Sequence, residues 1–77
     1  MKLSSEKKRI VLNNQKLVYH LVKKLGITPN SSDYEDIISI GTIGLIKATI
    51  SFDPSHKNTF STYAAKCIKN EIFQHYR

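Results

Sequence analysis

Residues 36–51 read DIISIGTIGLIKATIS, an apolar segment with too many large side chains for one helix face. At 100° per residue, the apolar positions fall into two separate arcs. The first arc consists of Ile37, Ile38, Gly41, Gly44, Leu45 and Ala48. The second arc consists of Ile40, Ile43, Ile46 and Ile50. We expect the first arc to face a core and the second to be an exposed partner surface; the alternative is that both belong to the core.

Two further helices are predicted around this segment, whose own helix extends over about residues 33–51. Residues 5–25 show apolar side chains at helical spacing in their second half, while Asn13 and Asn14 weaken the middle. Residues 61–77 form the last helix, and polar loops separate the three. We therefore expect one all-α domain over residues 1–77, a small three-helix bundle in which the glycines of the middle helix allow close packing.

The charge balance narrows the class of partner. The 77 residues include 12 Lys and Arg against 6 Asp and Glu, a formal net charge of +6. This excess indicates an anionic partner: nucleic acid, a membrane surface or an acidic protein. A deep catalytic pocket is hard to build in so short a chain. No apolar run is long enough to span a bilayer, and the single Cys67 excludes an internal disulfide.

The predicted last helix separates an apolar side from a basic side. The basic side combines cations, aromatic rings and an amide, at Thr62, Tyr63, Lys66, Lys69, Asn70, Phe73 and Arg77. Cations neutralise phosphates, and aromatic rings stack on unpaired bases. This combination favours binding of single-stranded or opened DNA. The alternative is a solvated charged face with two half-buried aromatic side chains.

Catalytic and metal-binding patterns are absent from the sequence. His20, His56 and His75 are not at metal-ligand spacing. Cys67 borders the inward side of the last helix, which favours a structural role. We expect a binding module that is not an enzyme and uses no cofactor.

Three ordered blocks resemble region 2 of bacterial sigma factors of the sigma-70 family: residues 36–48, the Phe-Asp-Pro of residues 52–54, and the Phe-Ser-Thr-Tyr-Ala of residues 60–64. Residues 38–47 and 67–72 are most similar to sporulation-type sigma factors of Gram-positive spore formers. The resemblance implies a cytoplasmic bacterial factor in transcription initiation. Its implied partners are core RNA polymerase, the promoter −10 element and an anti-sigma factor, and no membrane is among them.

In that family, the helix matching residues 33–51 binds a coiled coil of the polymerase β′ subunit, the clamp helices. By position, the resemblance implies polymerase contacts at Asp36, Ser39, Ile40, Thr42, Ile43 and Ile46. All lie on the side of the second apolar arc. Ser39 and Ile40 stand where housekeeping members carry Gln and Glu, so the docking would be more apolar.

The last helix of the family recognises and melts the −10 element and holds flipped bases of the non-template strand. By position, the resemblance implies DNA contacts at Asn58, Phe60, Ser61, Thr62, Tyr63, Lys66, Cys67, Lys69, Asn70 and Phe73. Of these, Asn70 and Phe73 match positions that face the upstream part of the element, which is still duplex. Arg77 joins them on the basic side of the helix. Lys66 and Cys67 replace the tryptophan pair with which housekeeping members wedge the duplex open, so melting should be weaker.

The residues that carry the resemblance include no domain that would bind the −35 element. We expect either a fragment of a longer factor or one half of a split factor whose second protein supplies that domain. Two other functions stay open: a region 2-like module that binds a protein partner without DNA, and a basic helical protein that binds duplex DNA without polymerase. A membrane-surface helix at residues 5–25 is the weakest alternative, because it has no Trp.

Overall fold

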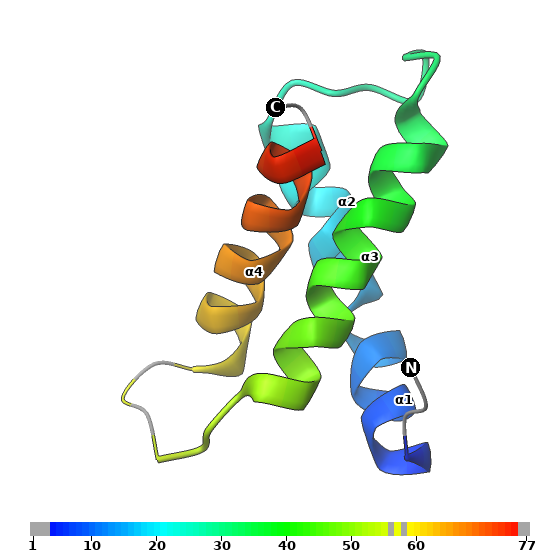
Figure 1. The fold of residues 1–77 in the computed structure, drawn as a ribbon. Coiled ribbons are helices and arrows are strands. Elements are labelled where there is room, and N and C mark those ends of the chain that lie inside the picture. The colour runs from blue at the N-terminus through cyan, green and yellow to red at the C-terminus, as the bar shows by residue number, and fades with distance from the viewer. Residues whose placement is uncertain (1–3, 56, 58, 76–77) are drawn as a thin grey trace.

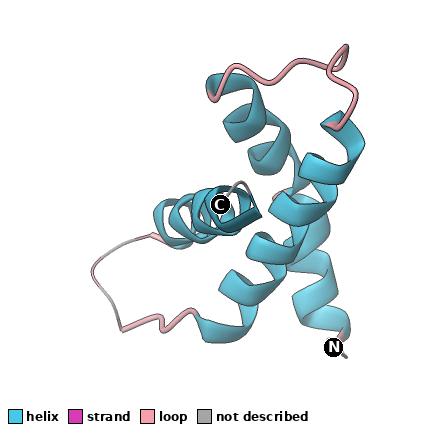
Figure 2. Ribbon diagram, turned by 45° about the horizontal axis from the view of Figure 1, so that its top comes forward, coloured by secondary structure: helices cyan, strands magenta, loops and turns pink. Residues whose placement is uncertain are grey.

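Helices dominate the computed structural model, which describes residues 4–55, 57 and 59–75 (Figure 1). They are α1 (Ser5–Asn13), α2 (Gln15–Lys24), α3 (Tyr34–Ser51) and α4 (Phe60–His75). No strand occurs among these residues (Figure 2). The all-α, three-helix architecture is confirmed, with the first predicted helix interrupted so that it becomes α1 and α2.

The interruption falls at Asn14, within the pair of asparagines that weakens this helix in sequence. The backbone of Asn14 leaves helical geometry, with φ −110° and ψ 9°. Its side-chain Nδ2 donates a hydrogen bond of 2.8 Å to the carbonyl oxygen of Ile10. Asparagine competes for backbone acceptors in this way, which makes it a poor residue for a helix interior. Both resulting helices still pack against α3.

A glycine ends α2 and fixes its last turn. Gly26 has φ 83°, in the left-handed region that glycine enters without strain. Its N–H donates to the carbonyl of Lys23 at 3.0 Å, and the N–H of Ile27 donates to the carbonyl of Val22 at 3.2 Å. These two bonds form a Schellman motif, which satisfies carbonyls at the end of the helix. The motif holds Lys23 and Lys24, the two cations of the last turn, in place.

The core forms where α3 packs against α4 and against the α1–α2 pair, with α2 also in contact with α4 (Figures 1 and 2). The first apolar arc of α3 faces it as expected: Ile37, Leu45 and Ala48 have no exposed surface. Thr49 is also buried, and its hydroxyl donates to the carbonyl of Ile46 at 2.7 Å. The remaining buried apolar side chains are Val11, Val18, Leu21, Val22, Ala64, Ile68 and Ile72.

Gly44 sets the spacing between α3 and α4. A Cβ atom at this position would lie 2.8 Å from both the carbonyl oxygen of Cys67 and the Cα of Ile68. Both of these atoms belong to the backbone of α4, so no rotation of a side chain could relieve the contact. Two helix backbones approach this closely only where a residue without a side chain stands between them. The structure therefore gives Gly44 the packing role that the sequence predicts.

α4 begins one residue earlier than predicted. The helix starts at Phe60, whereas the predicted start was Ser61, and Thr59 precedes it. The N–H of Thr62 donates to the hydroxyl oxygen of Thr59 at 3.3 Å, as in a helix N-cap. At the other end, the last described residue of the helix is His75, and the predicted residues 76 and 77 lie outside the described residues.

Candidate functional site

The outward side of α3 carries a partly exposed apolar surface, which we call the isoleucine ridge and define as Ile40, Ile43, Ile46 and Ile50. Around the helix axis, Ile43 and Ile50 lie between the other two isoleucines and form the centre of the ridge. This centre is open to solvent, with Ile43 44% exposed and Ile50 43% exposed. Its edges are half-buried, because Ile40 and Ile46 pack against the core. Each of the two alternatives therefore holds for half of the ridge. Ile40 and Ile46 lie partly in the core, whereas Ile43 and Ile50 are available for a partner.

Polar positions predicted to accompany the ridge differ in their freedom to bind. Asp36 and Ser39 are exposed. Thr42 is half-buried, and its hydroxyl already donates to the carbonyl of Ile38 at 2.8 Å and accepts from Nε2 of Gln15 at 2.9 Å. The Thr42 hydroxyl therefore ties α3 to the start of α2.

An open hollow lies beside Asp36 and Ser39 at the start of α3. Its volume is about 770 Å³, and Tyr19 of α2 forms part of its wall. The loop between α2 and α3 supplies the rest of the wall through Pro29, Ser31 and Ser32, together with Tyr34, Glu35 and Ile38 of α3. Glu35 and Asp36 make this end of the α3 surface acidic, although the chain as a whole has a net charge of +6.

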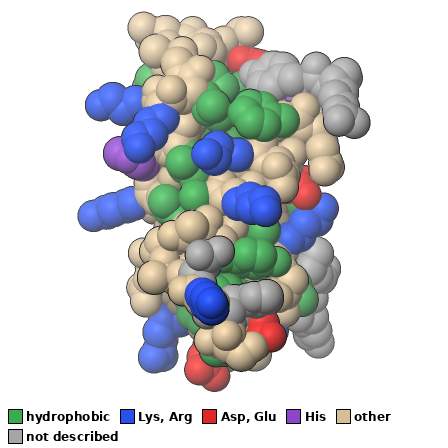
Figure 3. Space-filling view, turned by 90° about the vertical axis from the view of Figure 1, so that its left-hand side faces the viewer, with side chains coloured by type: hydrophobic (Ala, Val, Ile, Leu, Met, Phe, Trp, Pro, Cys, Tyr) green, Lys and Arg blue, Asp and Glu red, His purple; other side chains and the backbone are tan. Residues whose placement is uncertain are grey.

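A second surface is an open groove of about 760 Å³ between α2 and α4. From α4 it is lined by Ser61, Thr62, Tyr63, Ala65, Lys66, Lys69, Asn70 and Phe73. From α2 it is lined by Leu17, His20, Leu21 and Lys24. Seven of the residues predicted to contact DNA therefore share one groove. Figure 3 looks onto this side of the molecule, where cationic side chains lie among hydrophobic ones and a histidine stands beside them.

The side chains of this groove suit a solvated, charged ligand. Ser61, Thr62, Lys66, Lys69 and Asn70 are exposed. Phe73 is 53% exposed, although its side chain is wholly apolar. Cys67 is half-buried and does not line the groove. The predicted DNA contacts Asn58 and Arg77 lie outside the described residues.

The two aromatic residues at the start of α4 are partly occupied by contacts within the fold. Phe52 meets Phe60 edge-on, with ring centroids 5.3 Å apart, and lies 5.7 Å from the ring of Tyr63. The hydroxyls of Tyr63 and Ser51 share a hydrogen bond of 2.7 Å. Phe60 and Tyr63 thus anchor the start of α4 to the end of α3. Tyr63 also reaches the groove, whereas Phe60 does not line it.

Sequence reasoning missed the wall that α2 contributes. It predicted an apolar face for residues 5–25 and considered a membrane-surface helix there, but it assigned neither His20 nor Lys24 to DNA. His20 and Lys24 are four residues apart, so they lie on one side of the helix and both line the groove. That spacing was visible in the sequence, but the position of α2 beside α4 was not.

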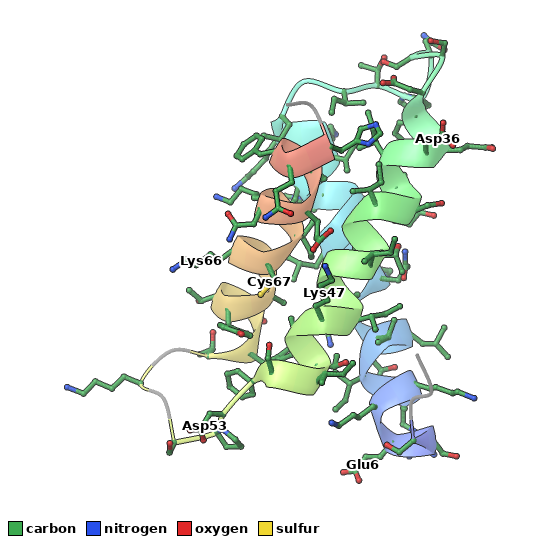
Figure 4. All side chains as sticks on the ribbon, in the orientation of Figure 1. Glu6, Asp36, Lys47, Asp53, Lys66 and Cys67 are labelled. Atoms are coloured by element: carbon green, nitrogen blue, oxygen red, sulfur yellow. The ribbon has the colours of Figure 1, made fainter. Side chains whose placement is uncertain are left out.

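The charges divide between the two surfaces. The described residues that line the groove include Lys24, Lys66 and Lys69, and none of them carries a carboxylate. The acid of α4, Glu71, instead faces α3, where it forms an ion pair with Lys47. In Figure 4, Asp36 on α3 and Lys66 on α4 point away from each other, toward opposite sides of the molecule. The arrangement therefore offers two separate binding surfaces of different chemistry.

Neither surface shows a metal site. Within residues 4–55, 57 and 59–75, no three His, Cys, Asp or Glu side chains come together in a way that could hold a metal ion. In the same part of the chain, no helix has the length and apolar character needed to cross a membrane.

Comparison with known proteins identifies the family. The family model described as Sigma-70 region 2 matches residues 10–77. The chain belongs to the sigma-70 region 2 family. Within this family, RNA polymerase sigma-28 factor of Bacillus thuringiensis subsp. kurstaki is 50% identical over 68 residues, which cover 88% of this chain and 28% of that protein.

Other sigma factors of spore formers are also similar. RNA polymerase sigma-K factor of Bacillus subtilis is 49% identical over 63 residues, 82% of this chain and 21% of that protein. RNA polymerase sigma-E factor of Clostridium acetobutylicum is 43% identical over 68 residues, 88% of this chain and 28% of that protein. The resemblance to sporulation-type sigma factors is thereby confirmed. The sigma-70 region 2 chain spans about a quarter of the length of these curated relatives.

Proposed function

We propose that this sigma-70 region 2 chain acts in transcription initiation by joining RNA polymerase to promoter DNA through two separate surfaces. The isoleucine ridge of α3 docks on the coiled coil of the polymerase β′ subunit. The groove beside α4 holds the unpaired non-template strand of the −10 element. The observation that carries this proposal is the pairing, in one small fold, of an exposed apolar ridge with a cationic, aromatic groove on another side.

The docking half of the proposal rests on the exposure of the ridge. Ile43 and Ile50 are each more than 40% exposed, so water covers apolar surface that the fold itself does not use. Burying the rest of such a side chain yields about 1 kcal/mol, taken as a little under half the value for a fully buried isoleucine. The exposed Asp36 and Ser39 lie on the same side of α3 and would supply polar contacts at the rim of the interface.

The DNA half rests on the composition of the groove. Lys66 and Lys69 can each neutralise a phosphate, and the exposed ring of Phe73 can stack on a base. Asn70, which follows Lys69 on the same helix, offers both a hydrogen-bond donor and an acceptor to a base edge. The groove is open and has a volume of about 760 Å³, so these side chains are accessible to a strand.

Strand opening should be a weaker activity than strand holding. Lys66 is exposed and carries no ring, and Cys67 is half-buried with its backbone packed on Gly44. Neither residue can stack between base pairs as an aromatic wedge does. We expect the chain to bind a strand that is already unpaired better than the same sequence in a duplex.

Core polymerase, this chain and a fluorescein-labelled single strand of −10 type provide the test. Fluorescence anisotropy should show measurable strand binding by this chain alone and tighter binding when both proteins are present. Replacing Lys69 by alanine should weaken that binding and reduce its salt dependence by about 0.7 in the slope of log K against log salt, the value for one phosphate contact with a single strand. Lys8→Ala, an exposed position on α1, is the matched control.

Two outcomes would contradict the proposal in different ways. Binding to polymerase with no effect on the labelled strand would favour a region 2-like module that contacts protein alone. Strand or duplex binding that is unchanged by polymerase would favour a basic DNA-binding protein outside transcription initiation.

A further inference from the structure

The groove has two walls, and only the α4 wall is accounted for by the proposed function. The other wall is α2, from which Leu17, His20, Leu21 and Lys24 line the same space. Leu21 is buried and Leu17 half-buried, so they form an apolar floor. His20 and Lys24 are exposed and rise from that floor opposite α4.

A strand lying in the groove would meet cations on both sides. Lys24 stands on the α2 wall, and Lys66 and Lys69 stand on the α4 wall. Among the described residues, no acidic side chain lines the space between them. Opposed cations of this kind follow a phosphate backbone along a channel, whereas cations on one wall would only attract it to a surface.

His20 adds a second flat ring to the groove. The imidazole is exposed on α2, while the phenyl ring of Phe73 is exposed on α4. Unpaired bases bind to proteins by stacking on aromatic and histidine side chains. The rings of His20 and Phe73 stand on opposite walls of the groove, so they can hold bases of one strand from both sides. A single helix could contact the strand from one side only.

We propose that His20 and Lys24 of α2 bind the same unpaired DNA strand as Lys66, Lys69 and Phe73 of α4, with Lys24 on a phosphate and His20 on a base. This inference rests on the proposed function, because it assumes that α4 holds a single strand. It assigns to α2 a binding role in addition to its part in the core. The end of α2 is suited to that role, since the Schellman motif at Gly26 fixes the last turn that carries Lys24.

Two pairs of neighbouring residues make the test specific. Lys23 and Lys24 are both exposed in the last turn of α2, but only Lys24 lines the groove. Tyr19 and His20 are both exposed on α2, but Tyr19 lines the hollow at the start of α3 instead. The two members of each pair therefore differ in access to the groove, although both are exposed and adjacent on the same helix.

The experiment measures binding of the 77-residue chain to a fluorescein-labelled single strand of −10 type, at several salt concentrations. Lys24→Ala should weaken binding about fivefold at 0.1 M salt and reduce the salt slope by about 0.7, which corresponds to one phosphate contact. Lys23→Ala should change neither. His20→Ala should weaken binding by about fivefold or more, as expected for loss of a stacked base, and Tyr19→Ala should leave it unchanged.

Equal effects of Lys23→Ala and Lys24→Ala would overturn the proposal. They would show that positive charge attracts the strand in general, and that the strand does not lie in the groove. Normal binding by both the Lys24 and His20 variants would also overturn it. If Lys69→Ala still weakens binding in that case, α4 alone holds the strand and only this inference fails.

If the native chain binds no single strand, or prefers the duplex of the same sequence, the DNA half of the proposed function fails with it. Equal thermal unfolding midpoints for Lys23→Ala and Lys24→Ala would establish that both variants fold alike.

Discussion

Replacing Gly44 by alanine tests how closely the two principal helices must approach. The added Cβ would lie 2.8 Å from the carbonyl oxygen of Cys67 and from the Cα of Ile68. Ordinary van der Waals contact begins at 3.4 Å, so α3 and α4 would have to separate by the difference, 3.4 − 2.8, or 0.6 Å. Since both atoms are backbone, the separation cannot be avoided by a change of rotamer.

Two opposing terms decide the size of the effect. Alanine gains about 1 kcal/mol over glycine inside a helix. Overpacking a well-filled core costs about 1–3 kcal/mol. Because the clash at Gly44 is with backbone, we expect a cost near the upper end, and hence a net loss of about 1–2 kcal/mol. For a domain of this length, each kcal/mol lowers the thermal midpoint by about 4–8 °C.

Thermal unfolding followed by circular dichroism measures the effect directly. Ser39→Ala is the matched control, because Ser39 is exposed on the same helix and should gain a few tenths of a kcal/mol from helix propensity. A Gly44→Ala variant that is more stable than the native chain would refute the close approach of the backbones. It would mean that the helices have room for the methyl group, and that only the propensity term acts.

Two further predictions follow from local contacts. Gly26→Ala should destabilise the chain by about 1 kcal/mol or more, because alanine is strained at φ 83°, and Gly26→Asn should cost less; equal midpoints for both variants in thermal unfolding would contradict a left-handed C-terminus of α2. Tyr63→Phe and Ser51→Ala should each cost about 0.5–1 kcal/mol through loss of their shared hydrogen bond, and Ser51→Ala also removes the bond from its hydroxyl to the carbonyl of Lys47. The double variant should cost less than the sum of the two, and strict additivity in urea unfolding would argue that the bond does not form in solution.

Helical periodicity was sufficient to predict the all-α class of the fold and the inward side of its longest helix. The residues that it placed inward on α3, including Ile37, Leu45 and Ala48, are buried. The break at Asn14 coincides with the asparagines that weaken the first predicted helix. These features depend on residues close together in sequence, for which the direction of each side chain follows from the helix geometry alone.

Features that depend on how helices meet could not be predicted in the same way. Periodicity gives the side of a helix on which Ile46 lies, but not whether a neighbouring helix covers it. For this reason the ridge was expected to be open along its whole length, while the structure half-buries Ile40 and Ile46. The α2 wall of the groove was missed for the same reason, since His20 and Lys24 acquire significance only beside α4. The contact of Phe52 with Phe60 likewise depends on how the end of α3 meets the start of α4.

The affinity of the chain for the isolated coiled coil of the polymerase β′ subunit tests the docking surface most directly. Ile43→Asp should weaken this affinity at least tenfold, because it places a charge at the open centre of the ridge, and it should leave single-strand binding unchanged. Phe73→Asp, which alters a similarly exposed apolar side chain in the groove, should do the reverse. Native affinity of the Ile43→Asp variant for the coiled coil, or equal losses in both variants, would contradict the assignment of the ridge as the polymerase-binding surface.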